Sequence, residues 1–485
     1  MKKTFGILLL SAVITPVGAQ RILSLDSCRQ MALRNNKQLG ISKLKQDVAE
    51  NIRKSARTKY LPHVSAIGTY EFTSEEISIL NDGQKAALGG LGTTIGGTLQ
   101  SSLGSLISTL PPATQMQMAQ DMAKVTAGLN QKGQNIVDAF RTDTRNIFAG
   151  SIVVTQPVFM GGAIVALNKM ADINTEMSKN TMEARRHATL YQIDQAYWQV
   201  VSLHHKKALA ESYLELVKKF DSDVHKMIDE GVATRSDGLS VDVKVNEAEM
   251  TLTKVNDGLV LSRMLLNQLC GLPLNESVVL QDEQADNIAV VELTPQLDVE
   301  SAVAHRPELK LLQNTVALSK QATNVLKAGN LPQVALMGGY AVSNPNVLNG
   351  FEKKFAGYWH VGVIVRVPIW NWGDVMYKVR ASKGATAIAN LELDEAREKI
   401  ELQVNQTTFK VDEANKKLTM AQKNIQRADE NLRTANLGFQ EGVISPTVVM
   451  EAQTAWLQAQ SQKIDAEIDV KLSQVDLQKA LGTLE

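Results

Sequence analysis

The stretch Gln156–Gly162 reads Gln-Pro-Val-Phe-Met-Gly-Gly, and a segment of similar outline, Val-Pro-Ile-Trp-Asn-Trp-Gly, occupies Val367–Gly373. The two prolines are 211 residues apart, and so are the glycines of Glu230–Val232 and Glu441–Val443. A constant separation means that neither copy gained or lost residues in between, as expected of long rigid helices. The repeat is longer than the units of short solenoids, and it predicts a molecule built from two similar halves.

The repeat extends toward the N-terminus, where Tyr60–Tyr70 is similar to Asn330–Tyr340. From Tyr70 to Pro157 there are 87 positions, but from Tyr340 to Pro368 only 28, so the first half carries 59 extra residues. This excess predicts an insertion at residues 73–146. The sequence thus divides into four predicted segments: a signal peptide at 1–19, a first repeat at 20–271, a linker at 272–296 and a second repeat at 297–485.

The N-terminus combines two lysines, a short apolar run at Phe5–Val17 and the small-residue motif Val17-Gly18-Ala19. This pattern is typical of a secretory signal peptide cleaved after Ala19. The run is shorter than the roughly 20 residues of a membrane-spanning helix. The 51 basic and 51 acidic residues balance, so there is no basic footprint for nucleic acid. The export signal points away from the cytoplasm.

Long helices are predicted by a seam in which a large and a small residue alternate every three or four positions. The seam consists of Val411, Ala414, Leu418, Ala421, Ile425, Ala428, Leu432, Ala435 and Phe439. The first copy keeps this spacing from Ile193 to Ile228, with polar breaks at Lys207 and Asp221. Each half therefore predicts a helix of nearly 70 residues, a tight turn and a return helix of about 35.

The return helices are predicted to continue the seam, from Val241 to Leu269 in the first half. In the second half the predicted positions are Val448, Ala452, Ala455, Ala459, Gln462 and Ala466. Ser236 and Thr447 are the predicted N-caps, and Pro446 suits the first helical position.

Four segments of about ten residues alternate in polarity and have aromatic residues near their ends, as transmembrane β-strands do. They lie near residues 64–72, 148–155, 334–340 and 358–367. Four strands cannot close a barrel, so the chain must oligomerise; two copies give eight strands and three give twelve, and we favour three. The polar side chains expected to line the lumen are Ser65, Thr69, Glu71, Ser151, Thr155, His360 and Arg366.

No pattern indicates catalysis, a cofactor or a metal site. Adjacent His204 and His205 do not share a helix face, and Gly89–Gly97 lacks the Lys-Ser/Thr ending of a phosphate loop. The insertion, with helix-like pieces such as Gln115–Leu129, is either a lid over the channel mouth or a mobile loop. Cys28 and Cys270 form either a disulfide or two buried free thiols.

The ordered motifs resemble the TolC-like outer membrane efflux and secretion channels. They are Leu25–Asn36, Tyr60-Leu61-Pro62, Asn330-Leu331-Pro332, the two proline-aromatic-glycine segments, the two Gly-Val turns and Ala480-Leu481-Gly482. The resemblance implies a mainly α fold with a membrane β-barrel: a homotrimer with four strands per chain in a twelve-stranded barrel and a coiled-coil α-barrel. It also implies the outer membrane of a Gram-negative bacterium, with a large periplasmic portion.

By resemblance, the channel is gated at its inner tips by an acidic ring, for which Asp237 and Glu451 are the matching acidic residues. The competing interpretation is that both carboxylates stabilise a helix N-terminus. Arg235 either bonds across the closed tip or is solvated. The predicted adaptor-docking residues are Gly231, Val232, Ala233, Thr234, Gly442, Val443, Ile444 and Ser445.

The expected function is that of a passive exit duct, not an enzyme. It would connect a periplasmic adaptor and an inner-membrane pump, either a proton-driven pump of the RND type or an ABC transporter, to the exterior. Two alternatives stay open: an outer-membrane channel for type I protein secretion, and a non-conducting coiled-coil spacer of the envelope.

Overall fold

The computed structural model describes residues 21–285, 299–349 and 352–484, apart from Ile77 and Thr142. The predicted signal peptide and residues 286–296 of the predicted linker therefore lie outside the described residues. The chain forms two compact units. A helical unit holds the chain up to Lys54, Leu167–Thr323 and the chain from Val379 onward; a strand unit holds Ser55–Ala166 and Asn324–Lys378.

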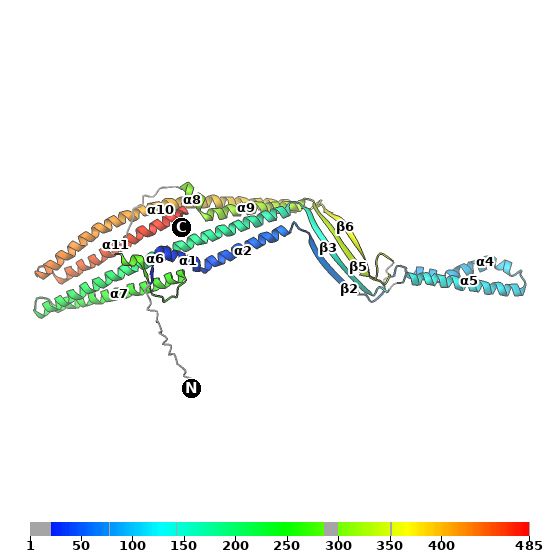
Figure 1. Ribbon diagram of the computed structural model, residues 1–485, viewed down its shortest axis with the longest axis horizontal. Helices are drawn as coiled ribbons and strands as arrows, with labels where there is room; N and C mark the ends of the chain where they lie inside the picture. The colour runs from blue at the N-terminus through cyan, green and yellow to red at the C-terminus, as the bar shows by residue number, and fades with distance from the viewer. Residues whose placement is uncertain (1–20, 77, 142, 286–298, 350–351, 485) are drawn as a thin grey trace, which may run out of the picture. The chain divides into compact units, whose positions relative to one another are not determined.

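Two long helical hairpins carry most of the helical residues (Figure 1). In the first, α6 (Ala163–Asp229) has 67 residues and α7 (Arg235–Cys270) has 36. In the second, α10 (Asp374–Gln440) and α11 (Pro446–Leu481) have the same two lengths. The predicted lengths are confirmed. At 1.5 Å per residue, each long helix extends about 100 Å.

Shorter elements precede each hairpin. They are β1 (Arg21–Leu23), α1 (Leu25–Asn35), α2 (Lys37–Thr58), β4 (Val278–Leu280), η1 (Gln281–Gln284), α8 (Val299–His305), α9 (Pro307–Lys327) and η2 (Ala328–Asn330). Strands β1 and β4 pair in parallel, so the predicted linker contains regular structure. The last residue of α7, Cys270, accepts a hydrogen bond from Asn35 Nδ2 at 2.9 Å, which attaches this helix end to α1.

The predicted seam of α10 is confirmed, because all nine of its residues are buried or half-buried. The prediction for α11 is partly wrong. Val448, Ala455 and Gln462 are exposed, whereas neighbouring Val449 and Gln453 are buried. Small and apolar residues occur on both faces of α11, so the spacing alone did not identify the packed face.

The hairpin turns show that the N-cap prediction was wrong by two residues. Thr234 and Ser445, rather than Ser236 and Thr447, occupy the cap positions. Pro446 begins α11 as predicted, since its fixed φ suits the first helical position. Gly231 and Gly442 have φ angles of 76° and 71°, a left-handed conformation that favours glycine after a helix end.

The strand unit contains one antiparallel sheet in the order β2-β3-β5-β6. Its strands are β2 (His63–Phe72), β3 (Asn146–Met160), β5 (Gln333–Asn344) and β6 (Ala356–Arg366). All four predicted strands exist, and β3 and β5 are longer than predicted. The pairing shifts between Pro157 and Phe159, where proline lacks the N–H that a continuous ladder needs.

The insertion forms three helices: α3 (Asp82–Gly89), α4 (Leu91–Ile107) and α5 (Pro112–Ala139). Glycines permit their close packing. A Cβ added at Gly92 would lie 2.1 Å from the Thr126 carbonyl oxygen, and one at Gly133 would lie 1.8 Å from that of Leu88. The glycine-rich segment of the insertion is thus largely helical and packs against α5. Among the described residues, no helix has the length and hydrophobicity needed to cross a membrane.

Candidate functional sites

One face of the sheet is apolar and exposed. Strand pairing places the even-numbered side chains of β2, β3 and β5 together with the odd-numbered side chains of β6 on this face. Its amide side chains, Asn146, Gln156 and Asn344, lie toward strand ends. Its exposed apolar side chains include Val64, Tyr70, Phe72, Ile152, Val154, Leu336, Tyr340, Trp359, Val361, Val363 and Val365. A contiguous apolar surface of this kind is unusual on a protein surrounded by water.

The opposite face carries the predicted lumen residues. The register pairs Ile67 with Ser151, Gly339 with His360, and Gln333 with Arg366, which connects one face across all four strands. All seven predicted residues lie on it: Ser65, Thr69, Glu71, Ser151, Thr155, His360 and Arg366. The period-2 pattern therefore identified which residues share a face.

The sheet is open, because β2 and β6 are its two edges. Every neighbouring pair in the order is antiparallel, so the first and fourth strands run in opposite directions. Edge strands present unpaired backbone donors and acceptors that can pair with another chain. An edge β6 of one copy could thus add to β2 of another copy and continue the antiparallel pattern.

At the first hairpin turn, Asp237 acts in a capping box. Its carboxylate accepts hydrogen bonds from Thr234 N at 2.9 Å and Thr234 Oγ1 at 2.6 Å, while Thr234 Oγ1 accepts from Asp237 N at 3.2 Å. The Thr234 hydroxyl and backbone hydrogen bonds lower the pKa of Asp237. The helix-cap interpretation thus accounts for this carboxylate, and Arg235 beside it is exposed.

Glu451, the other predicted gate residue, lies in a groove of about 810 Å³ between the starts of α7 and α11. Ser240 and Glu247 of α7 line the same groove. Glu247 forms an ion pair with Lys244, with 2.8 Å between Oε2 and Nζ. Asp237 is not among the residues that line it. The structure of one chain therefore does not bring Asp237 and Glu451 into one acidic cluster.

The predicted docking residues are mostly exposed: Gly231, Val232, Thr234, Gly442, Val443 and Ser445. Ala233 and Ile444 are half-buried. Ile444 packs against a tip core that contains Phe220, Phe439 and Val449. It therefore anchors the second turn, while Val443 projects from it.

A cluster that the sequence patterns did not reveal lies between α6 and α7. Asp221, His225 and Asp242 place ligand-type atoms within 4.8 Å of one another. In the sequence pattern, Asp221 is only a polar residue that interrupts the apolar seam. The four-residue spacing of Asp221 and His225 was visible in the sequence, but the packing of Asp242 beside them depends on the hairpin register.

Cys28 and Cys270 are free thiols, both buried, and they are neighbours in one core with Ile193, Tyr197 and Leu266. The Cys270 thiol points at the Cys28 carbonyl oxygen, 3.9 Å from its sulfur. A hydrogen bond with Cys270, together with burial, raises the pKa of the Cys28 thiol above its ordinary range.

Buried ionic groups hold the short elements against α6. Arg29 of α1 donates to both carboxylate oxygens of Asp194, Nε–Oδ1 at 2.8 Å and Nη2–Oδ2 at 2.6 Å. Burial raises the pKa of Asp194, although Arg29 opposes this effect. Tyr197 of α6 donates a hydrogen bond to Asp282 of η1. These contacts fix α1 and η1 on the long helix.

Comparison with known proteins finds a family match for the second repeat. Residues 299–483, which run from α8 to the end of α11, match the family described as outer membrane efflux protein. This second half of the chain is therefore similar to that family. The family is one of channels rather than of enzymes.

A longer part of the chain is similar to a curated relative of the same kind. The outer membrane protein TolC of Vibrio cholerae is 20% identical over 351 residues, which cover 70% of this chain and 77% of that protein. The resemblance indicated by the motifs is thus confirmed. Such homologues are outer membrane proteins of Gram-negative bacteria.

Solved structures show the same fold. The outer-membrane channel OprN has 15% identity and a TM-score of 0.73, with 95% of this chain and 90% of that chain covered. The open state of the MtrE outer membrane channel of Neisseria gonorrhoeae has 15% identity and a TM-score of 0.70, with 95% and 89% covered. The efflux-protein fold therefore covers both halves of the chain, including the first, which the family match does not reach.

Proposed function

We propose that this protein is the outer-membrane exit duct of a tripartite efflux system and passively conducts small molecules such as drugs or toxic compounds to the exterior. The observation that carries the proposal is the two-faced sheet in a chain with the efflux-channel fold. One face is apolar, and the other mixes polar and charged side chains with apolar ones. In a membrane, the apolar face would contact lipid and the polar face would line water.

We infer that three chains together close the sheet. Twelve strands form an even-numbered antiparallel barrel when β6 of each chain pairs with β2 of the next. The equal lengths of the two hairpins support an internal duplication, and six hairpins would surround a periplasmic tunnel with quasi-equivalent walls. The competing spacer function gives no reason for an exposed apolar sheet face.

The partners follow from this arrangement. The exposed turns Gly231–Thr234 and Gly442–Ser445 would dock a periplasmic adaptor, which connects the duct to a proton-driven or ABC-type inner-membrane pump. The energy for transport would come from the pump, because this chain contains no recognisable nucleotide site. Type I protein secretion uses the same parts with a different pump and substrate.

The test of the proposal is single-channel recording of the purified mature protein in a planar bilayer, with its mass in detergent determined in parallel. We expect a trimer that gives small, steady, cation-selective openings. A monomer or dimer without conductance would favour the spacer and contradict the barrel.

The same recordings test the proposed acidic constriction. Asp237→Asn with Glu451→Gln removes both charges but retains the shape and much of the hydrogen bonding of each side chain. We expect weaker block by trivalent cations and lower cation selectivity. Glu395→Gln, which changes an exposed acid on α10, is the control and should leave block unchanged. Unchanged block in the double variant would leave Asp237 with its capping role alone.

We also propose that Cys28 and Cys270 join in a disulfide when a thiol oxidant of the exported compartment removes one hydrogen from each thiol. The burial of both thiols in one core, with the Cys270 sulfur 3.9 Å from the Cys28 carbonyl oxygen, supports this pairing. Protein purified from the envelope should have an intact mass lower by two hydrogens than the same protein after reduction. Cys270→Ser should abolish the difference. Equal masses before and after reduction would identify two free thiols.

A further inference from the structure

Asp221 is a carboxylate in a seam that is otherwise mainly apolar, and the proposed function does not use it. The residue at the matching position of the second repeat, 211 positions later, is Leu432. Asp221 is half-buried, and its Oδ1 atom is shielded from solvent without a hydrogen-bond partner among the described residues. The charge of this carboxylate is balanced either by a protonated His225, whose ring lies beside it, or by a bound cation.

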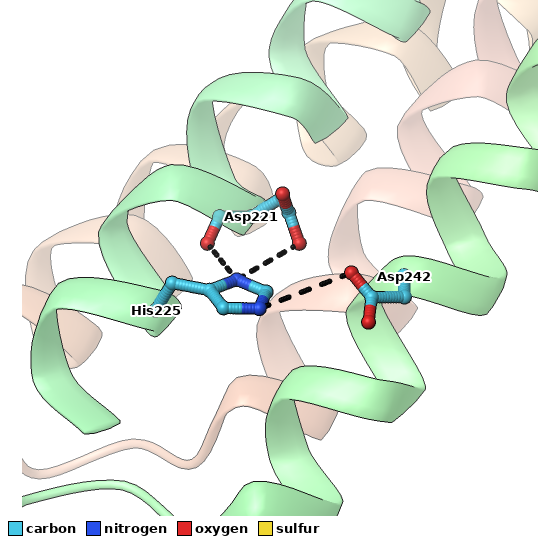
Figure 2. A group of neighbouring side chains, drawn as sticks. All are labelled: Asp221, His225 and Asp242. Carbon is cyan, nitrogen blue, oxygen red and sulfur yellow. Dashed lines mark hydrogen bonds and ion pairs between the residues drawn. The ribbon is translucent and has the colours of Figure 1, made fainter. Parts of the chain in front are cut away.

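His225 lies between Asp221 and a second carboxylate, Asp242 (Figure 2). His225 lies one helical turn later on α6, with Nδ1 3.3 Å from Asp221 Oδ1. Asp242 reaches across from α7, with Oδ1 4.0 Å from His225 Nε2. The last separation is too long for a hydrogen bond. It is close to the spacing of about 3–4 Å between two ligands that share one ion at 2.0–2.2 Å.

The histidine is oriented in the way that metal-binding histidines commonly are. Its Nδ1 lies 3.0 Å from the main-chain carbonyl oxygen of Asp221 and can donate its hydrogen there. This hydrogen bond selects the tautomer that leaves the Nε2 lone pair free toward Asp242.

Gly238 of α7 lies beside His225 and Ile228. A Cβ added at Gly238 of α7 would lie 3.6 Å from His225 Nε2 and 2.7 Å from Ile228 Cδ1. The matching residue of the second repeat is Val449, and those matching His225 and Asp242 are Asn436 and Gln453. The two carboxylates, the imidazole and the glycine thus occur together in the first repeat, and none of them occurs at the matching positions of the second.

We propose that Asp221, His225 and Asp242 bind a divalent transition-metal ion of the zinc class between α6 and α7. One imidazole and two carboxylates are ligands that suit Zn²⁺, and water would complete the coordination. The bound ion would join the two helices of the first hairpin close to its turn and leave the second hairpin without such a link. It would therefore stabilise the two hairpins unequally.

The experiment uses the full mature protein without a histidine tag, in detergent, after treatment with a chelator. Zn²⁺ binding is measured by titration calorimetry, and Co²⁺ binding by the visible absorption of the bound ion. We expect one ion per chain. His225→Gln and Asp242→Asn should each weaken binding roughly tenfold or more, the lower range for loss of metal-site groups. His187→Gln, on the same helix but outside the cluster, should bind as the parent does.

Asp242 is exposed, so Asp242→Asn should fold normally, and circular dichroism without metal checks this. Absence of binding in the parent protein, or equal binding in the two site variants and the control, would overturn the proposal and leave an ion-paired His225 between two carboxylates. The result does not depend on conductance, so failure of the channel function and failure of the metal site are distinguished.

Discussion

Replacement of Arg29 by methionine is expected to lower the free energy of unfolding by about 3–5 kcal/mol, the range for breaking one side of a buried ion pair. The Asp194 side chain is 0% exposed, so the variant leaves its carboxylate without water and without a counter-charge. The measurement is thermal or denaturant unfolding of the purified protein, followed by circular dichroism.

An exposed pair of similar geometry provides the control. Arg433 also forms a bidentate pair, with Glu430, but both side chains are more than 60% exposed. Arg433→Met should cost at most about 1 kcal/mol. Arg29→Met with Asp194→Leu removes both charges and should recover most of the lost stability. If Arg29→Met and Arg433→Met lower the free energy of unfolding equally, burial does not increase the contribution of the Arg29–Asp194 pair to stability.

The pH dependence of the Arg29 variant has a definite sign. Burial raises the pKa of Asp194, and Arg29 opposes that rise, so its removal lets the pKa rise further. A carboxyl with a raised pKa binds a proton more readily in the folded state than in the unfolded state. The stability defect should therefore be greatest near neutral pH and should shrink as the pH falls toward the raised pKa.

Val361→Arg is expected to destabilise the membrane-inserted protein by about 2–4 kcal/mol, the range for a basic residue on the lipid face near the bilayer midplane. Val361 lies in the middle of β6 on the apolar face and is 75% exposed in one chain. The measurement is the denaturant midpoint of trimer reconstituted in lipid, together with the amount of trimer in outer membrane fractions.

The neighbouring residue is the matched control, because His360 points to the opposite face. His360→Arg should retain trimer and stability, since the polar face would contact water. If both variants behave alike, or if His360→Arg is the more damaging, the assignment of the two faces to lipid and lumen is wrong.

The helices were predictable because their pattern is strict and local. Large and small residues alternate from Val411 to Phe439 without a slip, and the long helix packs along that stripe. Prediction failed in α11, where Val448 and Val449 are adjacent and equally apolar. Which of the two valines is buried depends on the helices that pack against α11. The spacing of apolar residues along one helix does not reveal those partner helices.

In the candidate sites, too, local sequence patterns predicted some features, and features that depend on exact helix ends or packing were missed. Alternation along Ser65, Thr69 and Glu71 was enough to place three side chains on one sheet face. It was not enough to show that Asp237 bonds Thr234, because that depends on the exact residue at which α7 begins. Asp242 was missed for a related reason: its approach to His225 follows from the length of the hairpin turn.

The two unpaired edges of the sheet have a further consequence for how the protein reaches its final form in the cell. In the described part of a single chain, the outer edges of β2 and β6 have no partner strand, and the apolar face beside them is exposed. In the proposed trimer, the stability of the strand unit would depend on the concentration of chains, as it does for obligate oligomers. The fraction of correctly folded protein would then rise with its expression level. On dilution in detergent, the strands should unfold before the long helices.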